Sequence, residues 1–437
     1  MFQTLKNALK VPELKSKLLF TLLIVVLYRL GANIPVPYVS ADVLNTFKEV
    51  TAGSIFQYMN ILSGDAFGRA TLFALNVSPY ITASIVIQLL TVAIPAMERM
   101  AKDGEEGKKK LNNITRYTTV GLALVTAWGY AMYLKNYGML ENSGVFAMIV
   151  IIACFCAGAS MIMWLAEKVN EKGIGNGISI ILFANIVSRG PAMVGSLWNM
   201  VFTGGGFSGF KVSGLIFALL TIVVVAVAVV LVVWFTNSER RIPIQYAKRV
   251  VGRKVYGGQA SNLPISLNMN GVMPIIFASS IVSIPATIGA FFPNSGFWKG
   301  VVKVFNYTSP LYLILYLILI FAFAFFYVMI SFNPIEVANN IKNNGGAIPG
   351  IRTGRPTAEY ISKILSRITV LGAIFLSVIA GGPILVNMIV TLINPNTTFS
   401  AIAFGGSSLL IVVGVALETF RDMEAQMTMR NYKGFLD

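Results

Sequence analysis

The residues of this sequence that are best placed for chemistry are clustered arginines and lysines. The run NNGGAIPGIRTGRPT (343–357) carries Arg352 and Arg355 and no acid. The run 236–271 is built alike, and it opposes a single acid, Glu239, to six cations: Arg240, Arg241, Lys248, Arg249, Arg253 and Lys254. Glycine and proline in both runs predict turns of defined shape, which favours docking surfaces. The alternative is that the charges only set membrane topology and contact lipid headgroups.

Catalysis is not indicated. The chain has no His. It also has no nucleophile–base pair, no metal-ligand cluster, and neither a His-Glu-x-x-His nor a Gly-x-Ser-x-Gly motif. The phosphate-binding motif Gly-x-x-x-x-Gly-Lys-Ser/Thr is also missing. We therefore expect no enzyme activity, no cofactor and no metal.

The two cysteines are interpreted as ordinary core thiols. Cys154 and Cys156 are two residues apart in an apolar run. A helix points such side chains about 200° apart, so they cannot pair with each other.

The composition is that of a membrane protein. Of 437 residues, 56% are hydrophobic and 12% are charged, and the net charge is +16. Soluble domains carry about 25% charged residues. The stretch 1–17 is basic and amphipathic, and the apolar run after it is long enough to span and lacks a cleavage site. It is interpreted as a first transmembrane helix.

A helix needs about 20 apolar residues to cross a bilayer, and ten segments qualify. The predicted spans are 18–34, 77–95, 115–134, 145–166, 174–194, 214–235, 272–292, 309–330, 364–384 and 399–419. The stretch 54–74 is also apolar, but Gly64, Asp65, Gly68 and Arg69 interrupt it. It is expected to be too broken to span by itself.

The basic residues orient these spans. Lys and Arg collect in cytoplasmic loops, and here 26 lie on one side of the predicted spans and 7 on the other. Both termini and both basic runs are therefore expected to be cytoplasmic. Within the longer run, Val250-Val251-Gly252 is interpreted as a turn and Val255-Tyr256 as a short strand.

The spans lack the ionisable groups that ion-coupled carriers usually place at mid-membrane. Arg29, Arg116, Arg189, Arg367 and Glu418 all lie near the ends of predicted spans. An ion-coupled carrier is therefore disfavoured.

Two of the predicted spans carry polar side chains among the apolar ones. In 77–95, Val77, Ile81 and Ile85 recur at helical spacing and form one stripe. Polar positions in this span and in 272–292 include Ser84, Gln88, Ser279, Ser280 and Ser283. Hydroxyls of this kind favour helix packing, and a wall that is sometimes wet remains the alternative.

Several long motifs resemble the SecY family. They are LSGDAFGRATLFALNVSPYITASIVIQLLT (62–91), EKGIGNGISI (171–180), QYAKRVVGRKVYGGQASNLPISLNMNGVMPIIFASSI (245–281), FNPIEVANNIKNNGGAIPGIRTGRPTAEYI (332–361) and FGGSSLLIVVGVALET (404–419). The resemblance covers essentially the whole chain in order, and the PGIRTG form favours the bacterial type. Two departures are Asp65 and Tyr38, which stand where family members often have glycine.

The resemblance implies an all-α polytopic membrane protein with ten transmembrane helices in two pseudo-symmetric halves around an hourglass pore. The first half would be 1–195, with helices 1–5 and a plug segment at 54–69. A hinge loop, 196–213, would join it to 214–437, with helices 6–10. The second half would carry the cytoplasmic loops 236–271 and 331–363.

The resemblance also assigns roles to residues. The pore ring would be Val77, Ile81, Ile85, Leu182, Ile276 and Ile411. The plug would include Leu62, Ser63, Gly64, Asp65, Gly68 and Arg69. The lateral gate would comprise Ser84, Gln88, Ser279, Ser280 and Ser283. Motor or ribosome docking would use Lys248, Arg249, Arg253, Lys254, Arg352 and Arg355.

The function that this implies is a protein-conducting channel of the bacterial inner membrane. It would pass unfolded preproteins, release transmembrane segments sideways into lipid, and be driven by the SecA ATPase or the ribosome. The implied partners are SecE, SecG, signal peptides, anionic lipids and YidC. The alternatives left open are a small-solute carrier and a non-transporting scaffold or insertase.

Overall fold

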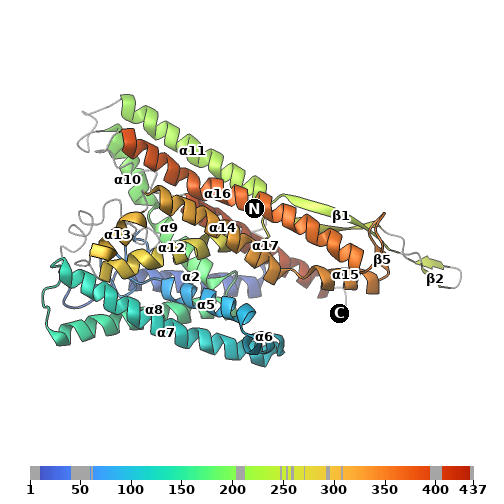
Figure 1. Cartoon of the computed structure of the whole chain (residues 1–437), viewed down its shortest axis with the longest axis horizontal. Coiled ribbons are helices and arrows are strands. Elements are labelled where there is room, and N and C mark those ends of the chain that lie inside the picture. Colours follow the sequence, from blue (N-terminus) through green and yellow to red (C-terminus); the bar gives the residue numbers. More distant parts are fainter. Residues whose placement is uncertain are drawn as a thin grey trace.

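The computed structural model is an elongated bundle of helices with a slender strand extension at one end (Figure 1). It describes residues 10–40, 60, 63–202, 212–246, 249–251, 254–256, 260–269, 271–291, 296–306, 309–393 and 406–433. Of the predicted site residues, Leu62, Lys248 and Arg253 lie outside the described residues, as do half of the predicted plug segment and half of the predicted hinge loop.

Helices lie over all ten predicted spans. They are α2 (Pro12–Gly31), α5 (Ser78–Ala93), α7 (Gly104–Asn136), α8 (Val145–Lys172), α9 (Gly177–Ser188) with α10 (Gly190–Val201), α11 (Val212–Thr236), α12 (Met273–Phe291), α14 (Pro310–Ser331), α16 (Arg355–Ile393) and α17 (Gly406–Lys433). Shorter helices are α6 (Pro95–Lys102), α13 (Gly296–Val304) and α15 (Pro334–Asn343).

Five described helical stretches meet length and hydropathy criteria for crossing a membrane. They are Val145–Lys172, Gly177–Gly195, Gly214–Thr236, Pro310–Asn343 and Arg355–Val386. The pair α5 and α6 meets the criteria jointly but is bent by 102°. Ile94 lies between the two helices, and Pro95 begins α6, where its missing N–H costs no helical hydrogen bond.

Several boundaries differ from the sequence prediction. The predicted span 174–194 is two helices, because α9 ends at Ser188 and Pro191 lies in the first turn of α10. The predicted hinge loop, 196–213, is helical as far as Val201 and again from Val212. Likewise α16 begins at Arg355, inside the loop that was predicted to continue to 363.

The chain between α2 and α5 is irregular, as the sequence predicted for the part that is described. Residues 63–77 form successive turns rather than a helix. Four described non-glycine residues between α2 and α5 have left-handed backbone angles: Tyr38, Asp65, Ala70 and Asn76. Tyr38 (φ 66°) and Asp65 (φ 70°) are the two positions where the family resemblance expects glycine. Glycine adopts such angles without a steric cost, which gives that expectation a physical reason.

The two basic runs meet in one small sheet. Strand β1 (Glu239–Tyr246) pairs antiparallel with β4 (Ala260–Ser266) on one edge and with β5 (Gly346–Ala347) on the other. Isoleucines from β1, β4, α15 and α16 form a separate apolar core beneath the sheet. The sheet therefore gives the two runs one fixed base.

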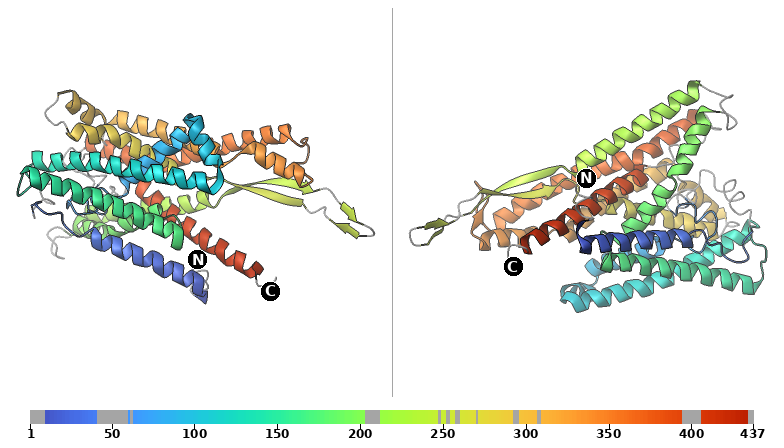
Figure 2. Two further views of the ribbon diagram at one scale, coloured as in Figure 1. Left: turned by 90° about the horizontal axis from the view of Figure 1, so that it is seen from below. Right: turned by 180° about the vertical axis from the view of Figure 1, so that it is seen from behind.

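Beyond this base, β2 (Arg249–Val251) pairs with β3 (Lys254–Tyr256) as a distal hairpin. Both views in Figure 2 show it projecting beyond the helices. The predicted strand at Val255-Tyr256 is confirmed. The predicted turn is wrong at Val250 and Val251, because these β-branched residues pair with Val255 and Lys254.

The main apolar core crosses the whole bundle. It joins buried side chains of α2, α5, α8 and α9 to those of α12, α14, α16 and α17. A second core packs the segment 63–77 against α7 and α8. Cys154 and Cys156 are free thiols, partly buried against this second core.

Candidate functional site

The six residues predicted as a pore ring converge in the main core. Val77, Ile81 and Ile85 come from α5 and its first cap, and Leu182, Ile276 and Ile411 come from α9, α12 and α17 respectively. All six are at most 7% exposed and belong to one continuous cluster of buried apolar side chains. Four helices that are far apart in the sequence thus supply a common aliphatic centre.

The stripe on α5 behaves as its spacing predicts. Val77, Ile81 and Ile85 are buried, whereas Val86, which follows Ile85 and is off the stripe, is 39% exposed. Branched aliphatic side chains offer no hydrogen bonds, so a centre built from them can exclude water without binding a peptide backbone.

The predicted lateral gate is a contact between α5 and α12, which pack against each other. On α12, Ser279 and Ser280 donate to the carbonyl of Ile276 at 2.9 and 2.8 Å. Ser283 donates to the carbonyl of Ser280 at 2.7 Å. On α5, the Gln88 amide donates to Ser84 Oγ at 3.4 Å.

Every one of these bonds stays within its own helix. In the part of the chain that the structure describes, no hydrogen bond or ion pair joins α5 to α12. The contact between these helices therefore rests on side-chain packing, which is less directional than a hydrogen bond or an ion pair.

The described part of the predicted plug is a compact set of turns. Ser63 is 1% exposed, and its Oγ donates to the carbonyl of Asn60 and accepts from the backbone N–H of Phe67. The Gly68 N–H donates to Asn60 Oδ1 at 2.7 Å, and a Cβ at Gly68 would lie 2.8 Å from that oxygen. A side chain at 68 would therefore displace the Asn60 amide from this position. Arg69 is exposed.

Aromatic rings hold the plug segment against α7 and α8. The ring of Phe67 stacks on Tyr130 with centroids 4.3 Å apart, and Tyr130 packs in turn against Phe155. The Tyr130 hydroxyl donates to the Phe67 carbonyl. Because α7 ends and α8 begins beside these contacts, the plug segment lies toward the end of the bundle that is opposite the strands.

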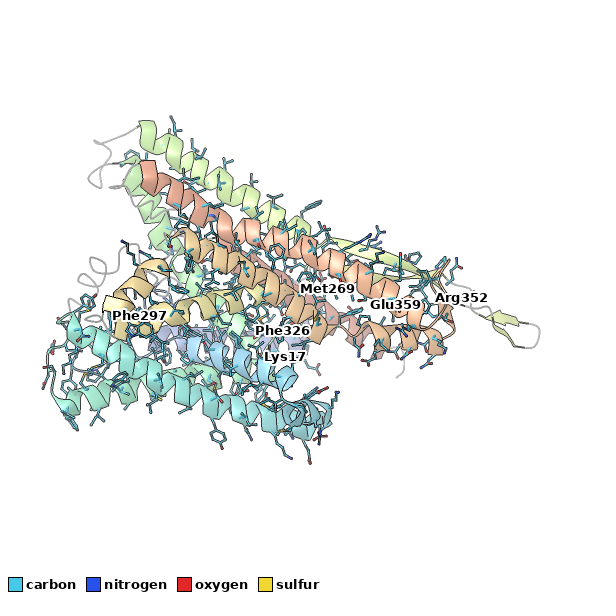
Figure 3. The ribbon with its side chains drawn as sticks, in the orientation of Figure 1. Lys17, Met269, Phe297, Phe326, Arg352 and Glu359 are labelled. Carbon is cyan, nitrogen blue, oxygen red and sulfur yellow. The ribbon has the colours of Figure 1, made fainter. Side chains whose placement is uncertain are left out.

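The predicted docking residues lie at the strand end. Arg352 is exposed between Gly350 (φ 81°) and Gly354 (φ 100°), whose left-handed angles shape the turn that presents it. Figure 3 places Arg352 beside the sheet, at the end of the bundle opposite Phe297 of α13. The Thr357 hydroxyl fixes this turn by donating to the Arg352 carbonyl at 2.8 Å.

The other predicted docking residues are also at this end. Arg355 opens α16, and its side chain is 91% exposed and ion-paired with Glu359 at 3.1 Å. Arg249 and Lys254 lie in the distal hairpin. The short helix α6 also carries cations, Arg99 and Lys102, and it contains none of the predicted docking residues. In α6, the hydrogen bond from Lys102 lowers the pKa of Glu98.

Sequence reasoning missed a buried polar cluster near the plug. Asn185 of α9 is 0% exposed, and its amide donates to the Tyr28 hydroxyl at 2.8 Å and to Asn76 Oδ1 at 3.2 Å. The Arg29 guanidinium reaches Asn185 Oδ1 at 3.4 Å. The available signal was one amide within the apolar run IILFANIVS, which pointed to no partner.

The described residues contain no group of three or more His, Cys, Asp or Glu that could hold a metal ion. The chemistry that the site offers is exclusion of water at an apolar centre and attraction of anions at a basic surface.

Solved structures define the class of fold. The chain is similar to a solved SecY structure. That structure is described as showing that the plug domain stabilises the closed state of the translocation channel and maintains a membrane seal. The TM-score is 0.66 at 19% identity, and the match covers 94% of this chain and 92% of that one. It is also similar to Sec61 in a canine ribosome–channel complex from the endoplasmic reticulum, with a TM-score of 0.61 at 18% identity and the same coverage. The fold is that of polytopic protein-conducting channels.

Sequence comparison defines the family. The SecY family profile matches residues 71–420. The protein translocase subunit SecY of Streptomyces galbus is 41% identical over 451 residues, covering 100% of both chains. This chain belongs to the SecY family, the channel-forming subunits of protein translocases, and it is a multi-pass membrane protein.

Proposed function

We propose that this chain forms the pore through which unfolded preproteins cross the bacterial cytoplasmic membrane, with ten transmembrane helices and both termini on the cytoplasmic side. The observation that carries the proposal is the aliphatic centre, which Ile81, Leu182, Ile276 and Ile411 build from four separate helices. Such a centre closes by excluding water and yields to a passing chain without holding it.

Lateral release of transmembrane segments is assigned to the contact between α5 and α12. Its support is that the polar side chains there bond within their own helices, so that separating the helices breaks no described hydrogen bond between them. A signal peptide can then replace packing contacts with packing contacts of its own.

The driving force is assigned to an external partner, the SecA motor or the ribosome, since the sequence contains no nucleotide-binding motif and no catalytic constellation. Support comes from the shared sheet of β1, β4 and β5, which fixes both basic runs on one base. The guanidinium fork of Arg352 suits RNA phosphates and carboxylates, because it makes paired hydrogen bonds to both. SecE, SecG, YidC and anionic lipids complete the proposed set of partners.

A substrate arrested during passage tests the proposal. Photo-crosslinking side chains placed at Ile81 and Ile276 are expected to capture the arrested chain, and one placed at lipid-exposed Val224 serves as the control. Crosslinks at Val224 but at neither isoleucine would favour a scaffold or insertase. Saturable uptake of a small solute by the chain alone would favour a carrier.

A further inference from the structure

The plug segment touches the helical wall through a polar contact at Gly64 and Asp65. A Cβ at Gly64 would lie 2.8 Å from Arg29 Nη1 and 2.9 Å from Ser188 Oγ, so the backbone here rests directly on α9 and on the last turn of α2. Asp65 follows and forms an ion pair with Arg189, with 3.6 Å between its Oδ1 and the arginine Nη2. Within the described ranges, this is the ion pair that joins the plug segment to a helix.

Asp65 is also bonded inside the plug. The side-chain amide of Asn60 donates to the same Oδ1 at 2.9 Å, and its amide oxygen Oδ1 accepts the backbone N–H of Gly68. The carboxylate therefore couples the internal structure of the plug to the wall. If Asp65 lost Arg189, the plug turns would keep their shape but lose their charged attachment.

Arg189 is held at the junction of two helices, as the last cap of α9 and the first cap of α10. Its side chain is 25% exposed, and among the described residues its Nη1 is buried without a hydrogen-bond partner. Arg29 brings a second guanidinium to the same wall. Losing the Asp65 carboxylate would therefore leave the Arg189 guanidinium partly buried and without its described ion-pair partner.

The backbone conformation of Asp65 indicates that its side chain has a role. Its φ of 70° is left-handed, and the family resemblance expects glycine at this position. Aspartate tolerates this conformation better than most residues but less well than glycine. A backbone outlier of this kind points to a role for the side chain.

We infer that Asp65, Arg189 and Asn60 form a latch on the plug, and that this latch sets how readily the channel opens and how strong a signal peptide must be to open it. The inference rests on the proposed function. It assigns to three residues a specificity-determining role that is separate from the apolar pore ring.

The test is resting ion conductance in planar bilayers in potassium chloride, with the full-length chain in the complex that it forms in its membrane. Asp65→Asn keeps a side chain that tolerates a left-handed backbone and removes the charge. Asp65→Gly removes the charge and relaxes the backbone. Each is expected to raise the resting open fraction by about fivefold, the upper range for a partly exposed ion pair. Arg189→Gln should do the same, and it should add little to Asp65→Asn because the two changes break one contact.

Export of a reporter with a weakened signal sequence is expected to rise in the same variants. Glu98→Gln is the matched control, because it neutralises the carboxylate of the Glu98–Lys102 ion pair on α6, outside the plug. It should leave both readouts unchanged. A plug that closes as tightly or more tightly in Asp65→Gly would show that Asp65 is only a tolerated misfit and would overturn the latch. Fully additive effects of Asp65→Asn and Arg189→Gln would overturn it too.

A pore-ring variant separates failure of the latch from failure of the proposed function. If Ile411→Asn leaks and the Asp65 variants do not, the latch is wrong and the pore assignment stands. If none of them leaks, the closed state is not maintained at either place, and both assignments fall.

Discussion

Replacing Ile411 by Asn tests whether the aliphatic centre is a seal. Ile411 is 2% exposed and lies in the same cluster as Ile81, Leu182 and Ile276. The side chains of that cluster are apolar and offer an amide placed there no hydrogen bond. Leaving such a group unsatisfied costs about 1–3 kcal/mol in the closed state. In an open, hydrated pore the same amide is solvated, so the cost falls on closure alone.

The magnitude follows from a two-state equilibrium. Each 1.4 kcal/mol shifts the ratio of open to closed channels by about tenfold, so Ile411→Asn should raise the resting open fraction by roughly 5- to 150-fold. The assay is single-channel conductance in planar bilayers, together with export of a reporter with a defective signal sequence. Both are expected to increase.

The matched control is Ile411→Leu, which keeps the volume and the apolar character of the side chain and should change the resting open fraction little. Ser at Ile276 should act in the same direction as Asn at Ile411, but more mildly. If Leu leaked as much as Asn, packing shape and not water exclusion would govern closure. A resting channel tightened by Asn would refute the seal altogether.

Three further predictions concern the docking surface and the backbone. Arg352→Glu should depress motor-dependent translocation severely while membrane insertion stays intact, because Arg352 is exposed. Arg352→Lys should be intermediate, since it keeps the charge but loses the planar guanidinium fork. Normal translocation by the Glu variant would contradict the assignment. Reversing the charges of Arg253 and Lys254 should weaken ribosome binding in a salt-sensitive way, and unchanged affinity at low salt would count against phosphate contacts. Tyr38→Gly should raise the midpoint of thermal unfolding, because the left-handed backbone (φ 66°) strains tyrosine by about 1 kcal/mol relative to glycine. A lower midpoint would show that contacts of the tyrosine side chain outweigh the strain.

The positions of the long apolar helices could be predicted because hydropathy is a local property. Each predicted span overlaps a helix, or two in the case of 174–194, and Val77, Ile81 and Ile85 are buried as their spacing indicates. Helix ends were less predictable: α16 begins at Arg355 because proline at 356 suits a first turn, and hydropathy does not register that preference. The break between α9 and α10 inside the predicted span 174–194 could not be predicted either, because hydropathy does not register the preference of Pro191 for a first turn.

Contacts between distant segments could not be predicted from one sequence. Nothing near Gln245 identifies Ala347 as its partner across the sheet, since such pairing depends on the fold that the intervening helices create. The ion pair of Asp65 and Arg189 spans a similar distance in the chain. Sequence reasoning noted Asp65 as a departure and Arg189 as a charge at a span end, but only the structure brings the two together.

The aliphatic centre and the latch of Asp65, Arg189 and Asn60 differ in chemistry because they meet different requirements. The centre must let every side chain pass, so it cannot use directed hydrogen bonds, and an apolar surface satisfies that demand. An apolar centre alone also offers little to distinguish a weak signal peptide from a strong one. A polar contact outside that centre, such as the one between Asp65 and Arg189, can be strengthened or weakened without changing what the pore conducts. We propose that the plug leaves its site when a substrate is engaged. Ile411→Asn should then alter ion leak in both the resting and the substrate-engaged channel, whereas Asp65→Asn should alter only the resting state. Conductance recorded with an arrested substrate in place separates the two cases, and equal leak from the two variants under that condition would refute this division of roles.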